Sequence, residues 1–146
     1  FLAYAKYKNE YIIRSCETFR LELPELTEAL ESFTKLNGNT RRSSVKIEPK
    51  ASGKSLVQVM RRLTDLNMIE SKPPKEEKLV RVNYIAPICK AQRVKLIQGA
   101  WNKDFIAELE SFPNGKHDDR LDALVIMLEE EVKHDGRRPR RPRVAN

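Results

Sequence analysis

The sequence has no long apolar run and contains few cysteines and glycines. No apolar stretch approaches the roughly 20 residues that a membrane-spanning helix needs, which excludes a membrane protein. Glycine occurs only 5 times in 146 residues, which excludes a collagen-like chain. Cys16 and Cys89 lie far apart and outside any Cys-x-x-Cys pair, so they predict neither a zinc site nor a disulfide framework. We interpret both cysteines as small buried apolar residues in a reducing compartment.

The remaining composition fits one globular domain with a charged exterior. The residues are 40% hydrophobic and 34% charged, and a chain of this length buries about two-thirds of its unfolded surface around a single core. The first residues carry neither the basic leader nor the apolar stretch of a signal peptide. Because no Met begins the chain, we expect a fragment or a processed piece of a longer protein.

Most of the net charge of +7 comes from a tail at residues 135–146. This tail holds five arginines, and without them 23 basic residues face 21 acidic ones. Its two prolines do not sustain a helix and its arginines repel one another, so we expect it to be disordered. Such an arm either binds the phosphate backbone of a nucleic acid, with release of counterions, or is a solvated terminus without a function.

The hydrophobic pattern predicts an α/β layered fold. Residues 1–22 alternate loosely and are rich in Tyr, Ile and Phe, which predicts two or three short strands with a turn near residues 8–10. Further strands are expected at residues 45–48 and 94–97. Helices are expected from Pro24 to Gly38, from Trp101 to Phe112 and from about Asp118 to Val132. A further helix is expected after Gly53, with the inward residues Leu56, Val57, Met60 and Leu63. Another is expected around Leu79, Val82 and Ala86, up to a break or kink at Pro87.

Residues 52–55, Ser-Gly-Lys-Ser, resemble the end of a phosphate-binding P-loop. The complete pattern requires a glycine at position 48, where this sequence has Glu48. A carboxylate there repels phosphate, and Pro49 has no N–H to donate. The sequence therefore disfavours nucleotide binding by this loop.

Glu48 itself ends the strand predicted at residues 45–48. A side chain at that place projects past the sheet edge into the crevice that α/β folds use for ligands. A lone glutamate at a strand end is more often only solvated, so its significance depends on which residues meet it.

Three aspartates, Asp118, Asp119 and Asp122, lie at the start of the last predicted helix. The pairs Asp118–Asp122 and Asp119–Asp122 are each spaced to share a helix face. Capping explains Asp118 or Asp119, because the helix dipole stabilises anions in the first turn. It explains Asp122 less well, since clustered carboxylates repel unless a hard cation such as Mg²⁺ binds them. The motif alone leaves capping and metal binding open, and His117 is interpreted as a turn residue rather than a base.

Three segments together resemble the C-terminal nuclease domain of large terminase subunits from tailed bacteriophages or prophages. They are residues 47–56 around Glu48, residues 101–109, and the Phe-Pro-Asn-Gly-Lys-His-Asp-Asp-x-x-Asp-Ala-Leu motif at residues 112–124. The resemblance implies a ribonuclease H-like fold over residues 1–134, with a mixed five-stranded sheet flanked by helices. It also implies a metal-dependent endonuclease that cuts concatemeric viral DNA during genome packaging.

The resemblance assigns a role to each acidic residue. It implies two divalent ions, Mg²⁺ or Mn²⁺, with Glu48 as the second acidic ligand and the Asp118–Asp122 cluster as the third catalytic position. Within that cluster, Asp119 and Asp122 are the preferred metal ligands. The first acidic residue of the family is an Asp at the start of the first strand. No acidic residue precedes Glu10, so we expect that Asp upstream of Phe1, on a strand that this chain carries only in part.

The resemblance also implies partners and a compartment. These are double-stranded DNA, an N-terminal ATPase motor domain of the same full-length protein, the phage portal and the small terminase subunit, in the cytoplasm of the host bacterium and without a membrane. Two other interpretations stay open: a non-catalytic DNA-binding or docking module, and another ribonuclease H-like nuclease of the resolvase or transposase type. Basic residues that either contact the DNA backbone or are ordinary surface charge are Lys50, Lys54, Arg61, Arg62, Arg137, Arg138, Arg140 and Arg141.

Overall fold

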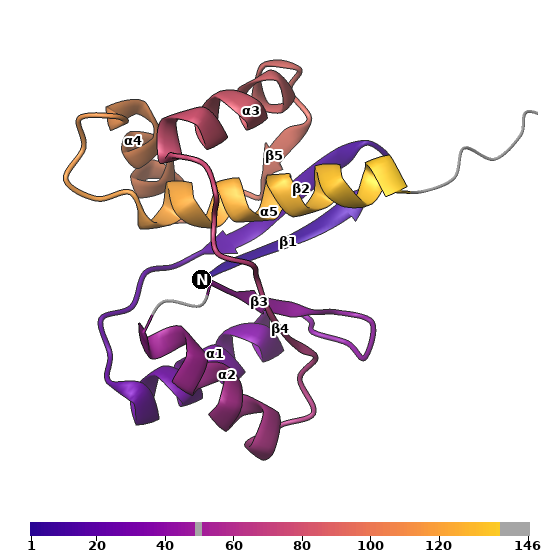
Figure 1. Ribbon diagram of the computed structural model, residues 1–146, viewed down its shortest axis with the longest axis vertical. Coiled ribbons are helices and arrows are strands. Elements are labelled where there is room, and N and C mark those ends of the chain that lie inside the picture. The colour runs from indigo at the N-terminus through magenta and orange to yellow at the C-terminus, as the bar shows by residue number, and fades with distance from the viewer. Residues whose placement is uncertain (49–50, 138–146) are drawn as a thin grey trace, which may run out of the picture.

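A computed structural model describes the backbone of residues 1–48 and 51–137 and, within these, the side chains outside residues 51–55 and 136–137. No helix in this part of the chain is long and apolar enough to cross a membrane. The elements in chain order are β1 (Leu2–Tyr7), β2 (Glu10–Cys16), α1 (Leu23–Leu36), β3 (Val45–Ile47), α2 (Ala51–Leu63), β4 (Met68–Glu70), α3 (Lys78–Lys90), β5 (Val94–Leu96), α4 (Asn102–Ser111) and α5 (Asp119–Arg137) (Figure 1).

The strands of the described residues form two sheets instead of the single five-stranded sheet that we expected. One sheet has the order β1-β2-β5, with β1 antiparallel to β2 and β2 parallel to β5. The other sheet is the parallel pair β3-β4. The α/β class and the mixed sheet are therefore confirmed, but the five strands of the described residues do not form one continuous sheet. β1 is an edge strand of the three-stranded sheet, and β3 belongs to the other sheet. Between these two strands lies a cavity of about 210 Å³, which residues of both strands line.

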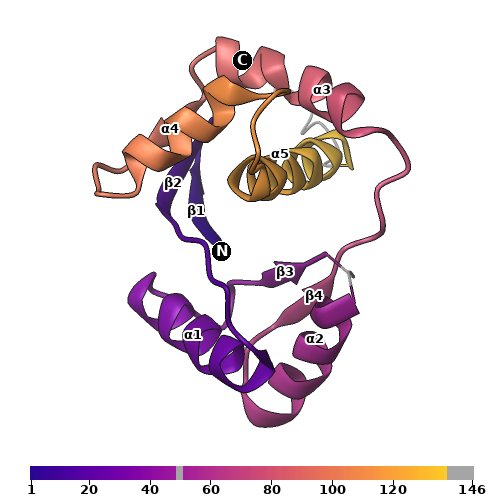
Figure 2. The same ribbon diagram turned by 90° about the vertical axis from the view of Figure 1, so that its left-hand side faces the viewer.

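Each sheet has its own hydrophobic core. Helices α3, α4 and α5 pack with the three-stranded sheet, and their core includes Tyr11, Phe105 and Leu128. Helices α1 and α2 pack with the two-stranded sheet around Leu30, Val57 and Met60. Figure 2 shows the two halves one above the other, with α5 in the upper half and α1 and α2 in the lower half.

Helix α5 forms much of the larger core. Leu121, Leu124, Val125 and Leu128 are at most 4% exposed, as the spacing of apolar residues predicts. The helix continues to Arg137, five residues beyond the expected end at Val132, and so includes the first residues of the predicted tail. Residues 138–146 lie outside the described residues.

Helix α3 differs most from the expectation. It runs through Pro87 to Lys90, and its buried residues are Arg81, Ile85 and Ile88. Of the residues expected on its inner face, Val82 packs half-buried against the larger core, whereas Leu79 and Ala86 are exposed. Pro87 is exposed, so water can satisfy the carbonyl that its missing N–H leaves without a helical partner. Arg81 is buried because its guanidinium binds Glu129 on α5, an ion pair that apolar spacing does not reveal.

Two smaller expectations also fail, and the structure adds one strand. Leu63 is 71% exposed instead of lying in the core, because α2 ends there. Cys89 is exposed, whereas Cys16 is buried as expected, and burial raises the pKa of the Cys16 thiol to about 11. The strand β4 was not predicted, and its parallel pairing with β3 defines it.

Truncating Leu128 tests the larger core. Leu128 is fully buried, so we expect Leu128→Ala to lower the free energy of unfolding by about 2–5 kcal/mol. Leu36→Ala is the matched control, because Leu36 is 85% exposed and its loss should change stability by no more than about 0.5 kcal/mol. Urea denaturation of both variants measures the difference. Equal destabilisation would show that α5 does not pack as described.

Candidate metal and DNA site at the start of α5

Two of the three aspartates form ion pairs with the same lysine side chain. Asp118 precedes α5 and its carbonyl accepts the N–H of Asp122 at 2.8 Å. The Lys78 ammonium, from the first turn of α3, forms ion pairs with the carboxylates of both Asp118 and Asp122. The Nζ of Lys78 lies 2.8 Å from Oδ1 of Asp122. Burial alone would lower the pKa of Lys78, but the hydrogen bonds to both aspartates raise it above its usual value.

Asp119 lies in a different environment from the other two. It lines a cavity of about 220 Å³ that also borders Phe1, Cys16 and Phe19. Asp119 is exposed, whereas Asp122 is half-buried. The structure therefore pairs Asp118 with Asp122, the i, i+4 pair, on the α3 side of α5. The assignment of Asp119 as a metal ligand stays a prediction, and so does the assignment of His117, which is exposed, to a turn without a catalytic role.

Glu48 was expected to end the strand at residues 45–48, but β3 ends at Ile47 and Glu48 follows it directly as a half-buried residue. It lines a cavity of about 420 Å³ between the segment 71–76, α3 and α5. Ile126, one turn after Asp122 on α5, lines the same cavity. One helical turn rises about 5.4 Å. The cavity that Glu48 borders therefore reaches α5 about one turn after Asp122.

The charges around this cavity come from both helices and from β3. The Nε and Nη2 atoms of Arg81 donate to the carboxylate of Glu129 at 3.1–3.3 Å. Lys46 on β3 binds Glu130 at 3.1 Å. Burial alone would raise the pKa of Glu130, but the hydrogen bond from Lys46 lowers it below its usual value.

The carboxylate pair suits a hard divalent cation. Within residues 1–48 and 51–137, no three His, Cys, Asp or Glu side chains are grouped so that they could hold a metal ion. Mg²⁺, however, is usually held by one or two carboxylates together with water and substrate phosphates. Asp118 and Asp122 already direct carboxylate oxygens at one positive charge, the Lys78 ammonium. The donor set at the start of α5 therefore fits Mg²⁺ or Mn²⁺.

Glu108 on α4 is a residue that the sequence analysis missed. Its carboxylate accepts the backbone N–H groups of Arg120 and Leu121 at 2.6 and 3.1 Å, and the Arg120 guanidinium at 3.0 Å. It thereby satisfies donors of the first turn of α5, which have no partner within the helix. The available signal was its place on the apolar face of α4, three residues after the buried Phe105.

The basic residues expected to contact DNA are only partly described. Arg61 and Arg62 are exposed on α2, and Arg61 donates to the carbonyl of Met68 at 2.9 Å. Arg61 thus also ties α2 to β4. The side chains of the remaining candidates lie outside the described residues: Lys50, Lys54, Arg137, Arg138, Arg140 and Arg141.

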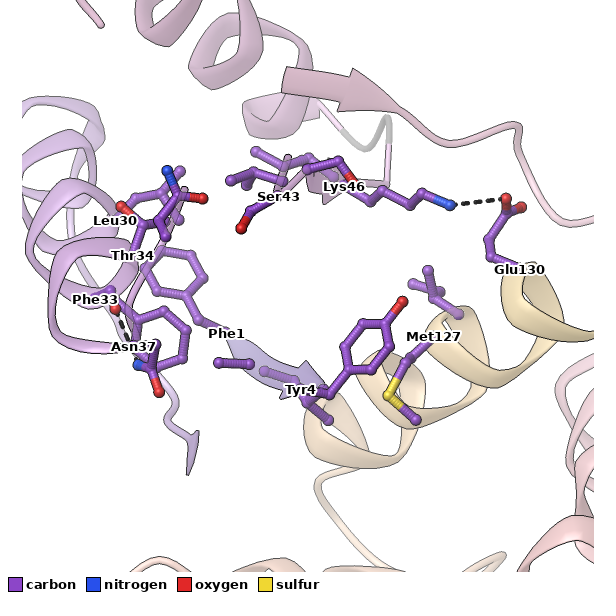
Figure 3. Close-up of a pocket in the computed structure, with 17 residues that line it drawn as sticks. Phe1, Tyr4, Leu30, Phe33, Thr34, Asn37, Ser43, Lys46, Met127 and Glu130 are labelled. Carbon is purple, nitrogen blue, oxygen red and sulfur yellow. Dashed lines mark hydrogen bonds and ion pairs between the residues drawn. The ribbon is translucent and has the colours of Figure 1, made fainter. Parts of the chain in front are cut away.

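A third cavity separates the two sheets. Residues 1–4 at the start of β1 line it on one side and residues 43–47 on the β3 side. Its remaining walls come from Leu30 and Phe33 on α1 and from Met127 on α5. Figure 3 shows the Phe1 ring beside Leu30 and Phe33, with Tyr4 and Met127 on the opposite wall and the Lys46–Glu130 ion pair across the top.

These features define an α/β domain with paired carboxylates at a helix start and a glutamate at a strand end. The chain belongs to the Terminase RNaseH-like domain family, whose model matches residues 6–131. The match confirms the resemblance to a terminase nuclease domain and supports a nuclease role in DNA packaging. No curated protein and no solved structure matches the chain.

Removing the Glu108 carboxylate tests how α5 is held. We expect Glu108→Ala to lower the free energy of unfolding by about 3 kcal/mol, because it removes a helix cap and leaves the largely buried Arg120 without this partner. Glu108→Gln should cost less, since the amide oxygen still accepts a backbone N–H. Glu110→Ala is the control, because Glu110 is exposed on the same helix. A Glu108→Ala variant as stable as this control would mean that the cap does not support α5.

Proposed function

We propose that the chain is the metal-dependent DNA endonuclease part of a packaging terminase, which cuts concatemeric viral DNA by two-metal phosphodiester hydrolysis. The observation that carries the proposal is the convergence of Asp118 and Asp122 on a single positive charge, within the segment that the family model matches. Bound Mg²⁺ or Mn²⁺ would supply an activated water and stabilise the leaving oxygen.

Each acidic residue has a part in this proposal. Asp118 and Asp122 hold one ion on the α3 side of α5, and Asp119 is the neighbouring candidate ligand. Glu48 contributes from the end of β3, through the cavity that reaches α5 one turn beyond Asp122. Glu108 positions this group of carboxylates, because it binds the first turn of α5.

DNA is the partner that the proposal requires most directly. The carboxylates repel phosphates, so basic groups outside the site must hold the substrate. Arg61 and Arg62 lie on α2, in the half of the molecule that also carries β3, and we include Lys50, Lys54 and the tail arginines as backbone contacts. The ATPase motor domain, the portal and the small subunit are partners in the same proposal, as is the host cytoplasm as the place of action.

The Asp upstream of Phe1 was expected on a continuation of β1. Because β1 and β3 both border the cavity between the sheets, we propose instead that this Asp lies on a separate strand that occupies the cavity. Both β1 and β3 are edge strands whose residues line this cavity. The added strand would pair with each of them and so join the two sheets. Apolar side chains already line both faces of that place, Leu30 and Phe33 from α1 and Met127 from α5. A strand there would be buried on both sides, as strands with helices on both faces are.

Replacing Asp122 tests the nuclease proposal. In a longer chain that includes the upstream strand, we expect Asp122→Asn to reduce plasmid cleavage in Mn²⁺ by about 100-fold or more, because the amide keeps the shape but loses the charge that holds a dication. Glu110→Gln, the same chemical change at an exposed residue of α4, should cleave like the parent. Thermal unfolding checks that both variants fold. Cleavage by Asp122→Asn at the parental rate, or none by the parent, would favour the non-catalytic DNA-binding module.

A designed extension tests the strand site. We expect a six-residue Val/Ile/Thr strand followed by Asn-Gly, placed before Phe1, to slow hydrogen exchange of backbone amides in both β1 and β3 and to raise the melting temperature by about 2–4 °C for each kcal/mol gained. The control extension has proline at alternate strand positions, which removes the donors needed for pairing. Equal exchange with both extensions would show that the cavity does not accept a strand.

A further inference from the structure

Lys78 is placed where its charge does not favour its own helix. It lies in the first turn of α3, where the partial positive charge of the helix dipole repels a cation. That first turn contains no acidic residue. The compensation comes from another element: both partners of Lys78, Asp118 and Asp122, belong to the start of α5, 40 or more residues later in the chain.

The two contacts of Lys78 resemble those of a bound cation. One ammonium pairs with one carboxylate before the helix and with a second carboxylate one turn later. Without a cation the two aspartates would repel each other, because like charges at i and i+4 destabilise a helix. The Lys78 ammonium pairs with both carboxylates and so offsets part of their mutual repulsion.

Lys78 can also leave without separating the two helices. Its side chain is 29% exposed, so the ammonium has a path into water. Three residues later, the Arg81 side chain is only 8% exposed and binds Glu129 through two nitrogens. Arg81 and its neighbours Ile85 and Ile88 keep α3 packed when the first-turn contact breaks.

We infer that Lys78 is a built-in counter-cation that competes with a divalent metal ion for Asp118 and Asp122. In the absence of metal it holds the carboxylates together and stabilises the start of α5. When Mg²⁺ or Mn²⁺ binds the two carboxylates, the ammonium moves away into solvent. Lys78 thereby lowers the affinity of the site for metal and limits its occupancy at low metal concentration. This inference rests on the proposed function, because it takes Asp118 and Asp122 as ligands.

The test measures metal binding directly, without cleavage. MnCl₂ is titrated into the same longer chain that the cleavage test uses, and into its variants. Paramagnetic broadening of the backbone amides of residues 118–122 is followed by NMR. We expect Lys78→Gln to bind Mn²⁺ about three- to tenfold more tightly, the range that two partly exposed ion pairs give. Lys78→Arg retains the charge and should bind Mn²⁺ with nearly the parental affinity. Lys90→Gln removes the same charge at the exposed end of α3 and is the matched control.

Thermal unfolding supplies a second measurement. In the absence of metal, Lys78→Gln should melt below the parent, because Asp118 and Asp122 lose their shared cation. Added MgCl₂ should raise its melting temperature more than that of the parent, since the metal then replaces the missing charge. Lys90→Gln should show the parental response to MgCl₂.

The outcomes separate the inference from the function on which it rests. If Lys78→Gln binds Mn²⁺ no more tightly than the parent while Asp122→Asn abolishes the broadening, Lys78 does not compete and the proposed metal site stands. If saturable broadening near residues 118–122 is absent from every variant, both the competition and the metal site are wrong. Tighter binding by Lys78→Gln, with Lys78→Arg and Lys90→Gln close to the parent, supports the inference.

Discussion

Repulsion among the carboxylates at the start of α5 is the constraint on which the surrounding structure depends. Asp118, Asp119 and Asp122 lie within five residues, and α5 must still begin there to bury its apolar face. Two other helices support this start in different ways, one by offsetting the negative charge and the other by accepting the free N–H groups of the first turn. Lys78 on α3 pairs with Asp118 and Asp122, and Glu108 on α4 binds the first backbone N–H groups of α5 together with Arg120.

Helix α5 links the chemistry to the architecture because its successive turns meet different elements. Its first turn carries the aspartates, Ile126 borders the cavity of Glu48, and Glu130 pairs with Lys46 on β3. The same helix supplies the fully buried Val125 and Leu128 to the core of the three-stranded sheet. A change in how α5 packs would therefore alter both the stability of this core and the position of the candidate site.

The two cores place the candidate site residues on different halves of the chain. The half built on β1, β2 and β5 contains α5 and its aspartates, whereas the half built on β3 and β4 contains Glu48 at its edge and Arg61 and Arg62 on α2. The candidate ligands thus come from both halves.

The sequence by itself determined the features that depend on local spacing. The apolar period placed α5 and its buried residues, the alternation in residues 1–22 gave β1 and β2, and the acidic motif with Glu48 indicated the terminase family. Only the tertiary structure decided the features that depend on long-range partners. These include the division into two sheets, the burial of Arg81 by Glu129, the cap from Glu108, and the pairing of Asp118 and Asp122 through Lys78. Each of these features depends on residues at least 12 positions apart or on which strands pair. Helical and strand periodicity describe only neighbouring residues, so they carry no information about such contacts.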